Sequence, residues 1–145
     1  MLALALTLAL AASTNDLQCL TDTVFHEARD QSEKGQYLVY LSIVNRVKDR
    51  RWPNTICGVT NQHKQYSYTL EHPSTLKLKI DKERRLYNGI LTIVQTWQQG
   101  YMTDLLDGEY KGINHYLRCD IIHKVKWTSK MTFLGREGDH CFYRG

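Results

Sequence analysis

Apolar side chains recur at helical spacing in three parts of the chain and predict three helices. The first helix is predicted over residues 17–29 and the second over residues 36–47. The third has Asp81 as its predicted N-cap and Gly100 at its end. The apolar stripe of the first helix consists of Leu17, Leu20, Val24 and Ala28, and that of the third of Leu86, Ile90, Val94 and Trp97.

The pattern changes on both sides of the third helix. Residues 55–70 mix polar and aromatic side chains, which predicts a loop with one short strand. Beyond Asp107-Gly108, short β-like runs follow at 113–117, 131–134 and 140–144. Helices in the first two thirds and short strands toward the C-terminus indicate an α+β fold. A chain of 145 residues holds one such domain but not two.

The first residues differ from the rest of the chain. Residues 1–12 carry no charge, and about a dozen apolar residues are too few for a membrane span, which needs about 20. The run matches the hydrophobic part of a secretory signal, although no Lys or Arg precedes it. We therefore expect residues 1–13 to be a secretory signal or a weak membrane tether, and residues 14–145 to form an exported domain.

Four cysteines fit an oxidising compartment. They are widely spaced and include no Cys-x-x-Cys pair, which favours two disulfides over a zinc site. Three connectivities are possible. We favour the pairing that ties each end of the domain to itself, Cys19–Cys57 with Cys119–Cys141.

The charge balance is mildly basic. Nineteen Lys and Arg against fifteen Asp and Glu give a net charge of +4 and a pI near 8.9. This excess is compatible with an anionic target and equally with an ordinary solvated surface. No nucleic-acid recognition motif accompanies it, so we expect no nucleic-acid partner.

Glu27 does not fit a purely structural interpretation. On a helix of 100° per residue it falls beside Leu20, Val24 and Ala28, on the apolar stripe. An ionised carboxylate is costly there, which favours a raised pKa and the chemistry of a general acid. The alternative is a carboxylate at the edge of the stripe that reaches water or pairs with Arg29 or Lys34.

A metal site is the weaker interpretation of the same stretch. His26-Glu27 begins like the zinc motif His-Glu-x-x-His, but position 30 is Asp and the other histidines are far apart. We expect no metal and no cofactor.

Motifs along most of the chain resemble the SleB-like cell-wall hydrolases, a family that includes spore-cortex-lytic enzymes and small phage endolysins. The family's Tyr-x-Glu-Ala-Arg-Gly-Glu is similar to residues 25–31, and its Asn-Arg-Val, Pro-Asn-Thr and Gln-Phe-Ser are similar to residues 45–47, 53–55 and 65–67. Its tyrosine-bearing strand resembles residues 114–116, and its closing Gly-x-His-x-Phe-Tyr resembles residues 138–143. Asp30-Gln31 stands where the family has Gly-Glu, and Phe25 where it has Tyr.

This resemblance implies a lysozyme-like fold and cleavage of peptidoglycan between N-acetylmuramic acid and N-acetylglucosamine. It implies that Glu27 is the acid and base of a lytic transglycosylase, with no need for the second carboxylate that ordinary glycosidases use. We expect substrate contacts from Gln65, Ser67, His115, Tyr116 and His140, and a monomer. Asp30, Asp104 and Glu109 remain possible partners of Glu27, and Trp52 and Trp127 are possible sugar-stacking residues.

Two rival hypotheses remain open. A zinc-dependent peptidoglycan amidase or peptidase would cut the stem peptide and lose activity with a chelator. A non-enzymatic wall-binding protein would be unaffected by Glu27→Gln.

Overall fold

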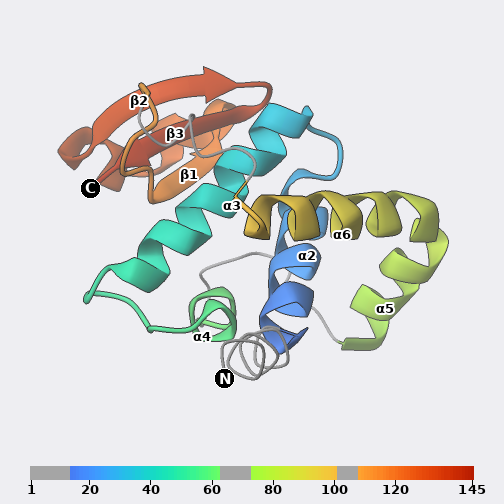
Figure 1. Cartoon of the computed structure of the whole chain (residues 1–145). Coiled ribbons are helices and arrows are strands. Elements are labelled where there is room, and N and C mark those ends of the chain that lie inside the picture. The colour runs from blue at the N-terminus through green and yellow to red at the C-terminus, as the bar shows by residue number, and fades with distance from the viewer. Residues whose placement is uncertain (1–13, 63–72, 101–107) are drawn as a thin grey trace, which may run out of the picture.

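The computed structural model describes residues 14–62, 73–100 and 108–145 of the chain (Figure 1). The helical part comes first, in the order α2 (Thr14–Ala28), α3 (Glu33–Lys48), α4 (Ile56–Thr60), α5 (Pro73–Lys82) and α6 (Arg84–Gln98). The C-terminal part then consists of β1 (His115–Arg118), the 3₁₀ helices η3 (Cys119–Lys124) and η4 (Trp127–Lys130), β2 (Thr132–Glu137) and β3 (His140–Arg144). The predicted α+β order is confirmed.

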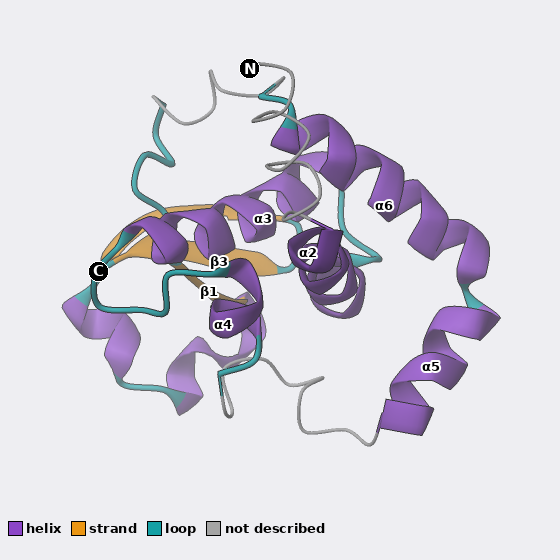
Figure 2. Cartoon of the chain, turned by 60° about the horizontal axis from the view of Figure 1, so that its bottom comes forward, coloured by secondary structure: helices purple, strands orange, loops and turns teal. Residues whose placement is uncertain are grey.

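The helix α3 is the centre of the fold. It packs against both α2 and β1, so that it lies between the helices and the sheet (Figures 1 and 2). Every residue from Gly35 to Ile43 is buried, not only the one face that the spacing predicted. Ser32 caps the helix, since its hydroxyl accepts a hydrogen bond from Gly35 N at 3.1 Å.

The helices α2 and α6 bury one stripe each against this core. In α2 the predicted stripe residues Leu20, Val24 and Ala28 are at most 1% exposed. In α6 the buried residues are Tyr87, Ile90, Val94 and Trp97. The Tyr87 hydroxyl donates to Asp22 Oδ1 at 2.5 Å and joins α6 to α2, and burial raises the pKa of Asp22.

The start of the third predicted helix is wrong. Asp81 is not an N-cap, because it lies inside α5, a helix that the sequence did not predict. Its carboxylate bonds the Arg84 guanidinium, and α6 begins after Glu83. Leu86 is also not part of the buried stripe: it is 41% exposed, because Tyr87 takes the position facing α2.

The loop predicted at 55–70 is partly helical. Thr55 caps the short helix α4 by accepting a hydrogen bond from Gly58 N at 2.9 Å. Residues beyond Gln62 in this stretch lie outside the described residues. Helix α4 is tied to α2 by the Cys19–Cys57 disulfide.

The three strands form one antiparallel sheet in the order β1-β3-β2. The strands match the predicted runs to within two or three residues, and the 3₁₀ helices between β1 and β2 were not predicted. Gly138, with a φ of 58°, and Asp139 make the turn between β2 and β3. The second predicted disulfide, Cys119–Cys141, joins η3 to β3, so both favoured pairings are confirmed.

The pairing register separates two faces of the sheet. Tyr116 pairs with Phe142 and Arg118 with His140, and these four residues define the inner face. His115 pairs with Tyr143 and Leu117 with Cys141, and these four define the outer face. Phe142 belongs to the main core, whereas Leu117, Cys141 and Tyr143 form a second, smaller core cluster.

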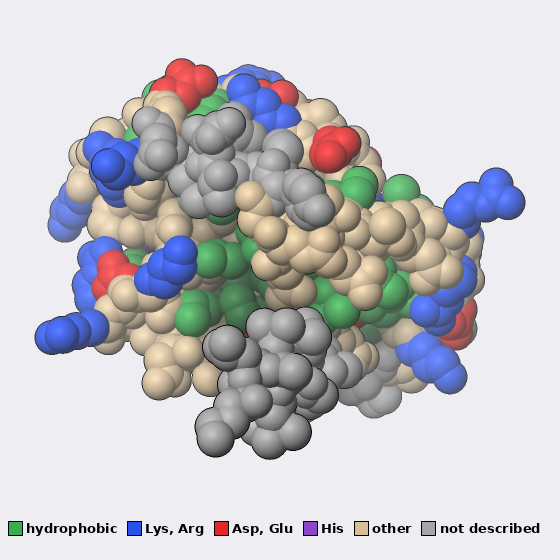
Figure 3. Space-filling view, viewed as in Figure 1, with side chains coloured by type: hydrophobic (Ala, Val, Ile, Leu, Met, Phe, Trp, Pro, Cys, Tyr) green, Lys and Arg blue, Asp and Glu red, His purple; other side chains and the backbone are tan. Residues whose placement is uncertain are grey.

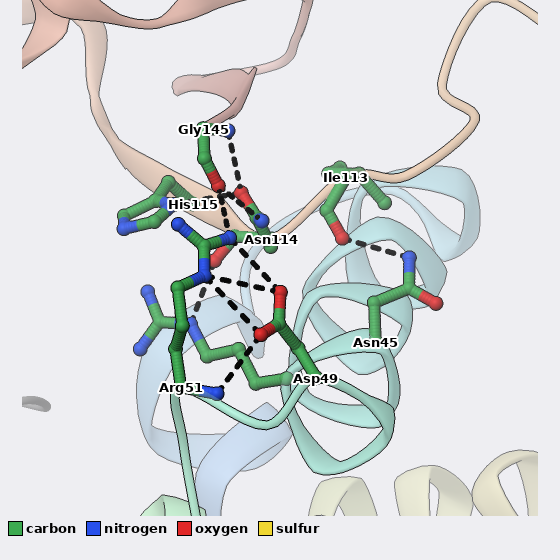
Figure 4. Close-up of polar contacts among 8 residues, drawn as sticks. Asn45, Asp49, Arg51, Ile113, Asn114, His115 and Gly145 are labelled. Carbon is green, nitrogen blue, oxygen red and sulfur yellow. Dashed lines mark hydrogen bonds and ion pairs between the residues drawn. The ribbon is translucent and has the colours of Figure 1, made fainter.

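Polar side chains near the end of α3 fix the approach to β1 (Figure 4). Asn45 Nδ2 donates to Ile113 O at 2.8 Å, and Arg46 Nε donates to Asn114 O at 2.6 Å. Asn114 Nδ2 and Arg51 Nη2 both donate to Gly145 O. Asn45 and Arg46 therefore brace the helix against the sheet.

None of the helices in the described part of the chain is long and apolar enough to cross a membrane. The predicted secretory signal or tether at residues 1–13 lies outside the described residues.

Candidate active site

A cleft of about 490 Å³ opens where three parts of the chain meet. The end of α2 and the turn after it contribute Glu27, Arg29 and Asp30. Glu83 and Leu86 come from the α5–α6 junction, and Arg118 and His140 come from the inner face of the sheet. Most of these side chains carry charge or hydrogen-bonding groups, so the cleft suits a polar ligand.

Glu27 stands at the boundary between this cleft and the core. Its side chain is half-buried, and its Oε1 atom is shielded from solvent. Its helical neighbours Val24 and Ala28 are fully buried. The position on the apolar stripe that the sequence predicted is thus confirmed.

The two cations that could have neutralised Glu27 in the structural alternative have other partners. Arg29 Nε pairs with Glu83 Oε2 at 3.0 Å, which links the residue after α2 to the residue before α6. Lys34 Nζ lies 3.7 Å from Glu137 Oε2 on β2. These pairs hold α2 and α3 against neighbouring elements.

His140 brings a neutral imidazole to the opposite wall. The residue is 4% exposed, and its Nδ1 atom is buried with no hydrogen-bond partner among the described residues. Burial lowers the pKa of His140, and the nearby Arg118 guanidinium acts in the same direction. At neutral pH the ring therefore carries no charge and can both donate and accept hydrogen bonds.

Tyr116 lies behind His140 on the inner face. The two rings meet edge to face with centroids 5.4 Å apart, and Tyr116 also contacts Phe142 at 6.0 Å. Tyr116 is not one of the residues that line the cleft; it supports the ring that does.

His115 points to the outer face instead. Its ring lies 5.7 Å from Trp52 and 5.5 Å from Trp127, and Nδ1 is 2.7 Å from Asn114 Oδ1. Burial lowers the pKa of His115 to about 4, helped by the guanidinium groups of Arg46 and Arg51. The structure does not bring His115 to the cleft of Glu27.

The other predicted site residues divide into two groups. Gln65, Ser67 and Asp104 lie outside the described residues. Among the possible carboxylate partners, Asp30 lines the cleft and Glu109 does not. Trp97 is a core residue, 4% exposed, as the sequence predicted.

Arg118, Glu83 and Leu86 line the cleft although the sequence did not indicate them. Arg118 sits at a strand end and the other two at a helix start, where no motif or spacing marks a site. They line the same cleft as Glu27 only because folding brings these distant segments of the chain together.

Gln31 joins the two sides of the site. Its Nε2 atom donates to Asp139 Oδ2 at 2.9 Å, and its Oε1 atom accepts from Asp139 N at 3.0 Å. Asp139 precedes His140 and Gln31 follows Asp30, so this pair of bonds fixes the β2–β3 turn against the end of α2. The Gln31 amide lowers the pKa of Asp139.

The residues 14–62, 73–100 and 108–145 contain no group of three or more His, Cys, Asp or Glu side chains placed to hold a metal ion. His26 lies in the cleft and packs on Phe25 with ring centroids 5.0 Å apart.

A comparison with known protein families finds a match for most of the chain. The profile of a family described as cell wall hydrolase matches residues 30–143, a segment that begins three residues after Glu27. Curated protein sequences include no match to the chain.

Two catalytic domains of solved structure share the fold. The catalytic domain of the germination-specific lytic transglycosylase SleB from Bacillus anthracis is 21% identical, with a TM-score of 0.65 over 91% of this chain and 96% of that one. The catalytic domain of SleB from Bacillus cereus is also 21% identical, with a TM-score of 0.60 over 91% of each chain. The predicted SleB-like, lysozyme-like fold is confirmed.

Proposed function

The chain belongs to the cell wall hydrolase family, and on this premise we propose that it cleaves peptidoglycan glycan strands as a lytic transglycosylase, with Glu27 as acid and base. The bond cut is the one between N-acetylmuramic acid and N-acetylglucosamine. The family profile starts after Glu27, so the assignment of this residue depends on the site itself.

One observation carries the proposal: Glu27 lines a polar cleft while its Oε1 atom is shielded from water. A general acid needs this combination of access to the substrate and partial desolvation, which favours the protonated carboxyl. Arg29 also lines the cleft, but its guanidinium forms an ion pair with Glu83.

In the proposed reaction, Glu27 donates its proton to the glycosidic oxygen as the bond from that oxygen to C1 of the muramoyl sugar breaks. N-acetylglucosamine leaves with a 4-hydroxyl. The muramoyl 6-hydroxyl then attacks C1 and passes its proton to the Glu27 carboxylate. The product is a 1,6-anhydro end, Glu27 is protonated again, and no water is consumed.

The opposite wall positions the sugar. The neutral His140 ring offers a hydrogen-bond donor and acceptor to hydroxyl or acetamido groups, and Arg118 adds donors at the same wall. Tyr116 acts through His140 by packing on its ring. Contacts from Gln65 and Ser67 to N-acetyl groups remain predictions.

The proposed place of action is outside the cytoplasm. Two disulfides support an oxidising compartment, and the apolar run at residues 1–13 is the proposed export signal or tether. Peptidoglycan is then the partner, and we propose that the protein acts as a monomer.

The test is a digestion of purified peptidoglycan with the wild type and Glu27→Gln, each with and without a chelator, with fragments identified by mass spectrometry. We expect 1,6-anhydro muropeptides from the wild type only, with no effect of the chelator. Reducing ends would indicate hydrolysis, for which Asp30 in the cleft could serve as the second carboxylate.

Two results would refute the proposal outright. Free stem peptides that disappear with chelator would support the zinc amidase. Wall binding without any fragments, unchanged in Glu27→Gln, would support the non-enzymatic protein.

A further inference from the structure

A second hollow lies beside the cleft, along one side of α6. Its volume is about 520 Å³. Its apolar lining residues are Leu86, Gly89, Ile90 and Ile93, and its exposed cationic ones include Lys82 and Arg85. We call this hollow the α6 trough.

The α6 trough adjoins the cleft of Glu27. Glu83 and Leu86 line both hollows and are therefore their common wall. Glu83 is held in place by Arg29, and Leu86 remains 41% exposed although it is a large apolar residue. A ligand that crosses Leu86 would occupy both hollows at once.

Gly89 keeps the trough open at a cost to the helix. It lies within α6, where glycine is less favourable than alanine because of its backbone freedom. Packing does not require a glycine here, since a Cβ atom at this position would meet nothing within 4 Å. The absent side chain instead leaves space in the wall of the trough.

The charges beside the trough are incompletely matched. Arg84 pairs with Asp81 and Glu83 with Arg29. Lys82 and Arg85 have no ion pair with any of the described residues. In Figure 3, Lys and Arg side chains project from the edge of the molecule where α5 meets α6. The trough thus combines an apolar surface with two available cations, which fits a ligand with small apolar groups and carboxylates.

We propose that the α6 trough binds the stem peptide of the muramoyl residue whose bond is cut at Glu27. This inference rests on the proposed function. The stem peptide is an acidic peptide rich in alanine, so its methyl groups fit the apolar wall and its carboxylates fit Lys82 and Arg85. It hangs from the 3-lactyl group of the same sugar that presents C1 to Glu27, so it leaves the cleft next to that residue.

The consequence is a preference for strands that carry peptides. The test measures kcat/KM for 1,6-anhydro end formation on soluble uncrosslinked glycan strands, and on the same strands after an amidase has removed the stem peptides. For the wild type we expect about tenfold higher kcat/KM on the peptide-bearing strands, equivalent to about 1.4 kcal/mol.

Gly89→Trp fills the trough and should reduce this ratio to about one, with the rate on stripped strands kept within about twofold of the wild type. Gly89→Ala is the matched control and should keep the wild-type ratio, because one methyl group leaves most of the space open. The rate on stripped strands also reports that each variant is folded.

The cations are tested by charge reversal. Lys82→Glu with Arg85→Glu should lower the ratio at least about threefold, because the acidic peptide then meets like charge. Lys48→Glu with Arg50→Glu changes the net charge equally on exposed residues near the far end of α3, and should leave the ratio unchanged.

A wild-type ratio near one, or a Gly89→Trp variant that loses both rates equally, would overturn the stem-peptide site while leaving the proposed reaction standing. If the wild type makes no anhydro ends from either substrate, the proposed function itself fails and the inference fails with it.

Discussion

The inner and outer faces of the sheet differ in character although the same strands build both. On the inner face, Arg118 and His140 reach the cleft opposite Glu27. On the outer face, Leu117, Cys141 and Tyr143 pack with Trp127 into the small second core, which the Cys119–Cys141 disulfide reinforces. Successive residues of a strand point to opposite faces, so His140 can serve the site while Cys141 serves stability. The alternation places the cleft residues and the second core cluster on opposite faces of the same strands.

The proposed activity of the cleft depends most on Glu27. We expect Glu27→Gln to reduce glycan cleavage by about 10³-fold, since positioned proton transfer contributes about 10²–10⁴-fold and the amide has no proton to give. The melting temperature should stay close to that of the wild type, because the shape of the side chain is kept. Release of soluble muropeptides and thermal unfolding by circular dichroism measure the two effects.

Glu33→Gln is the matched control, an exposed residue in the first turn of α3 that does not line the cleft. It should cleave at the wild-type rate. If Glu27→Gln cleaved glycan strands as fast as this control, Glu27 would not be the acid of the reaction, and the cleft would not differ from the outer face in its function.

Changes on the outer face should lower the stability of the protein and leave its activity nearly unchanged. Replacing Cys119 and Cys141 together by serine opens a link across 22 positions, and we expect a loss of about 3 kcal/mol in the free energy of unfolding. Urea unfolding measures this loss. At temperatures where the variant is folded, its kcat/KM should remain within a few-fold of the wild type, because these side chains do not reach the cleft. A large loss of kcat/KM at unchanged stability would show that the two faces are not separable.

A third prediction uses the outer-face histidine. The pKa of His115 is lowered to about 4 in the fold from its ordinary value of 6.5, so between these values the unfolded chain binds more protons than the folded one. The stability that depends on a neutral His115 is therefore complete above pH 6.5 and is lost as the pH falls toward 4. Because His115 is partly exposed, we expect about 2 kcal/mol rather than the full linkage value.

His115→Phe should abolish that part of the pH dependence, since phenylalanine still packs between Trp52 and Trp127 but does not titrate. The measurement compares the free energies of unfolding at pH 7 and pH 4.5, with the wild type as reference. Equal losses in both proteins on acidification would contradict a neutral His115 in the folded protein.

The same alternation explains what the sequence could and could not indicate. Motif similarity pointed to both His115 and Tyr116, but adjacent residues of a strand cannot face one cleft together. The hydrophobic spacing of α2 was sufficient to place Glu27 on the apolar stripe, because that position depends only on helix geometry. The disulfide pairs could be favoured because each joins segments near one end of the chain.

Other features depended on contacts between distant segments. Arg118 and Glu83 reach the cleft only after α2, α6 and the sheet have assembled. The all-round burial of α3 follows from its place between the sheet and α2, which the mixed spacing of its own residues did not indicate. The side chain of Asp81 suits a helix cap and therefore predicts a helix start, whereas the turn between α5 and α6 lies at Glu83.

The smallest expected effect concerns Gln31, which connects the inner face to the end of α2. Its amide both donates to and accepts from Asp139, and a glutamate, which stands at this position in the family motif, could not donate. Gln31→Ala should cost about 1 kcal/mol of stability, because it removes three exposed hydrogen bonds, and should lower kcat/KM about threefold by loosening His140. The pKa of Asp139 should rise toward its ordinary value, which NMR titration measures. Gln95→Ala, an exposed substitution on α6, should change none of these quantities appreciably.

Gln31→Glu should be less stable than Gln31→Ala at pH 7, since its carboxylate faces that of Asp139. Its stability should recover as the pH falls and the carboxyls protonate. If Gln31→Glu were as stable as the wild type at pH 7, the amide would not be what holds the turn beside His140.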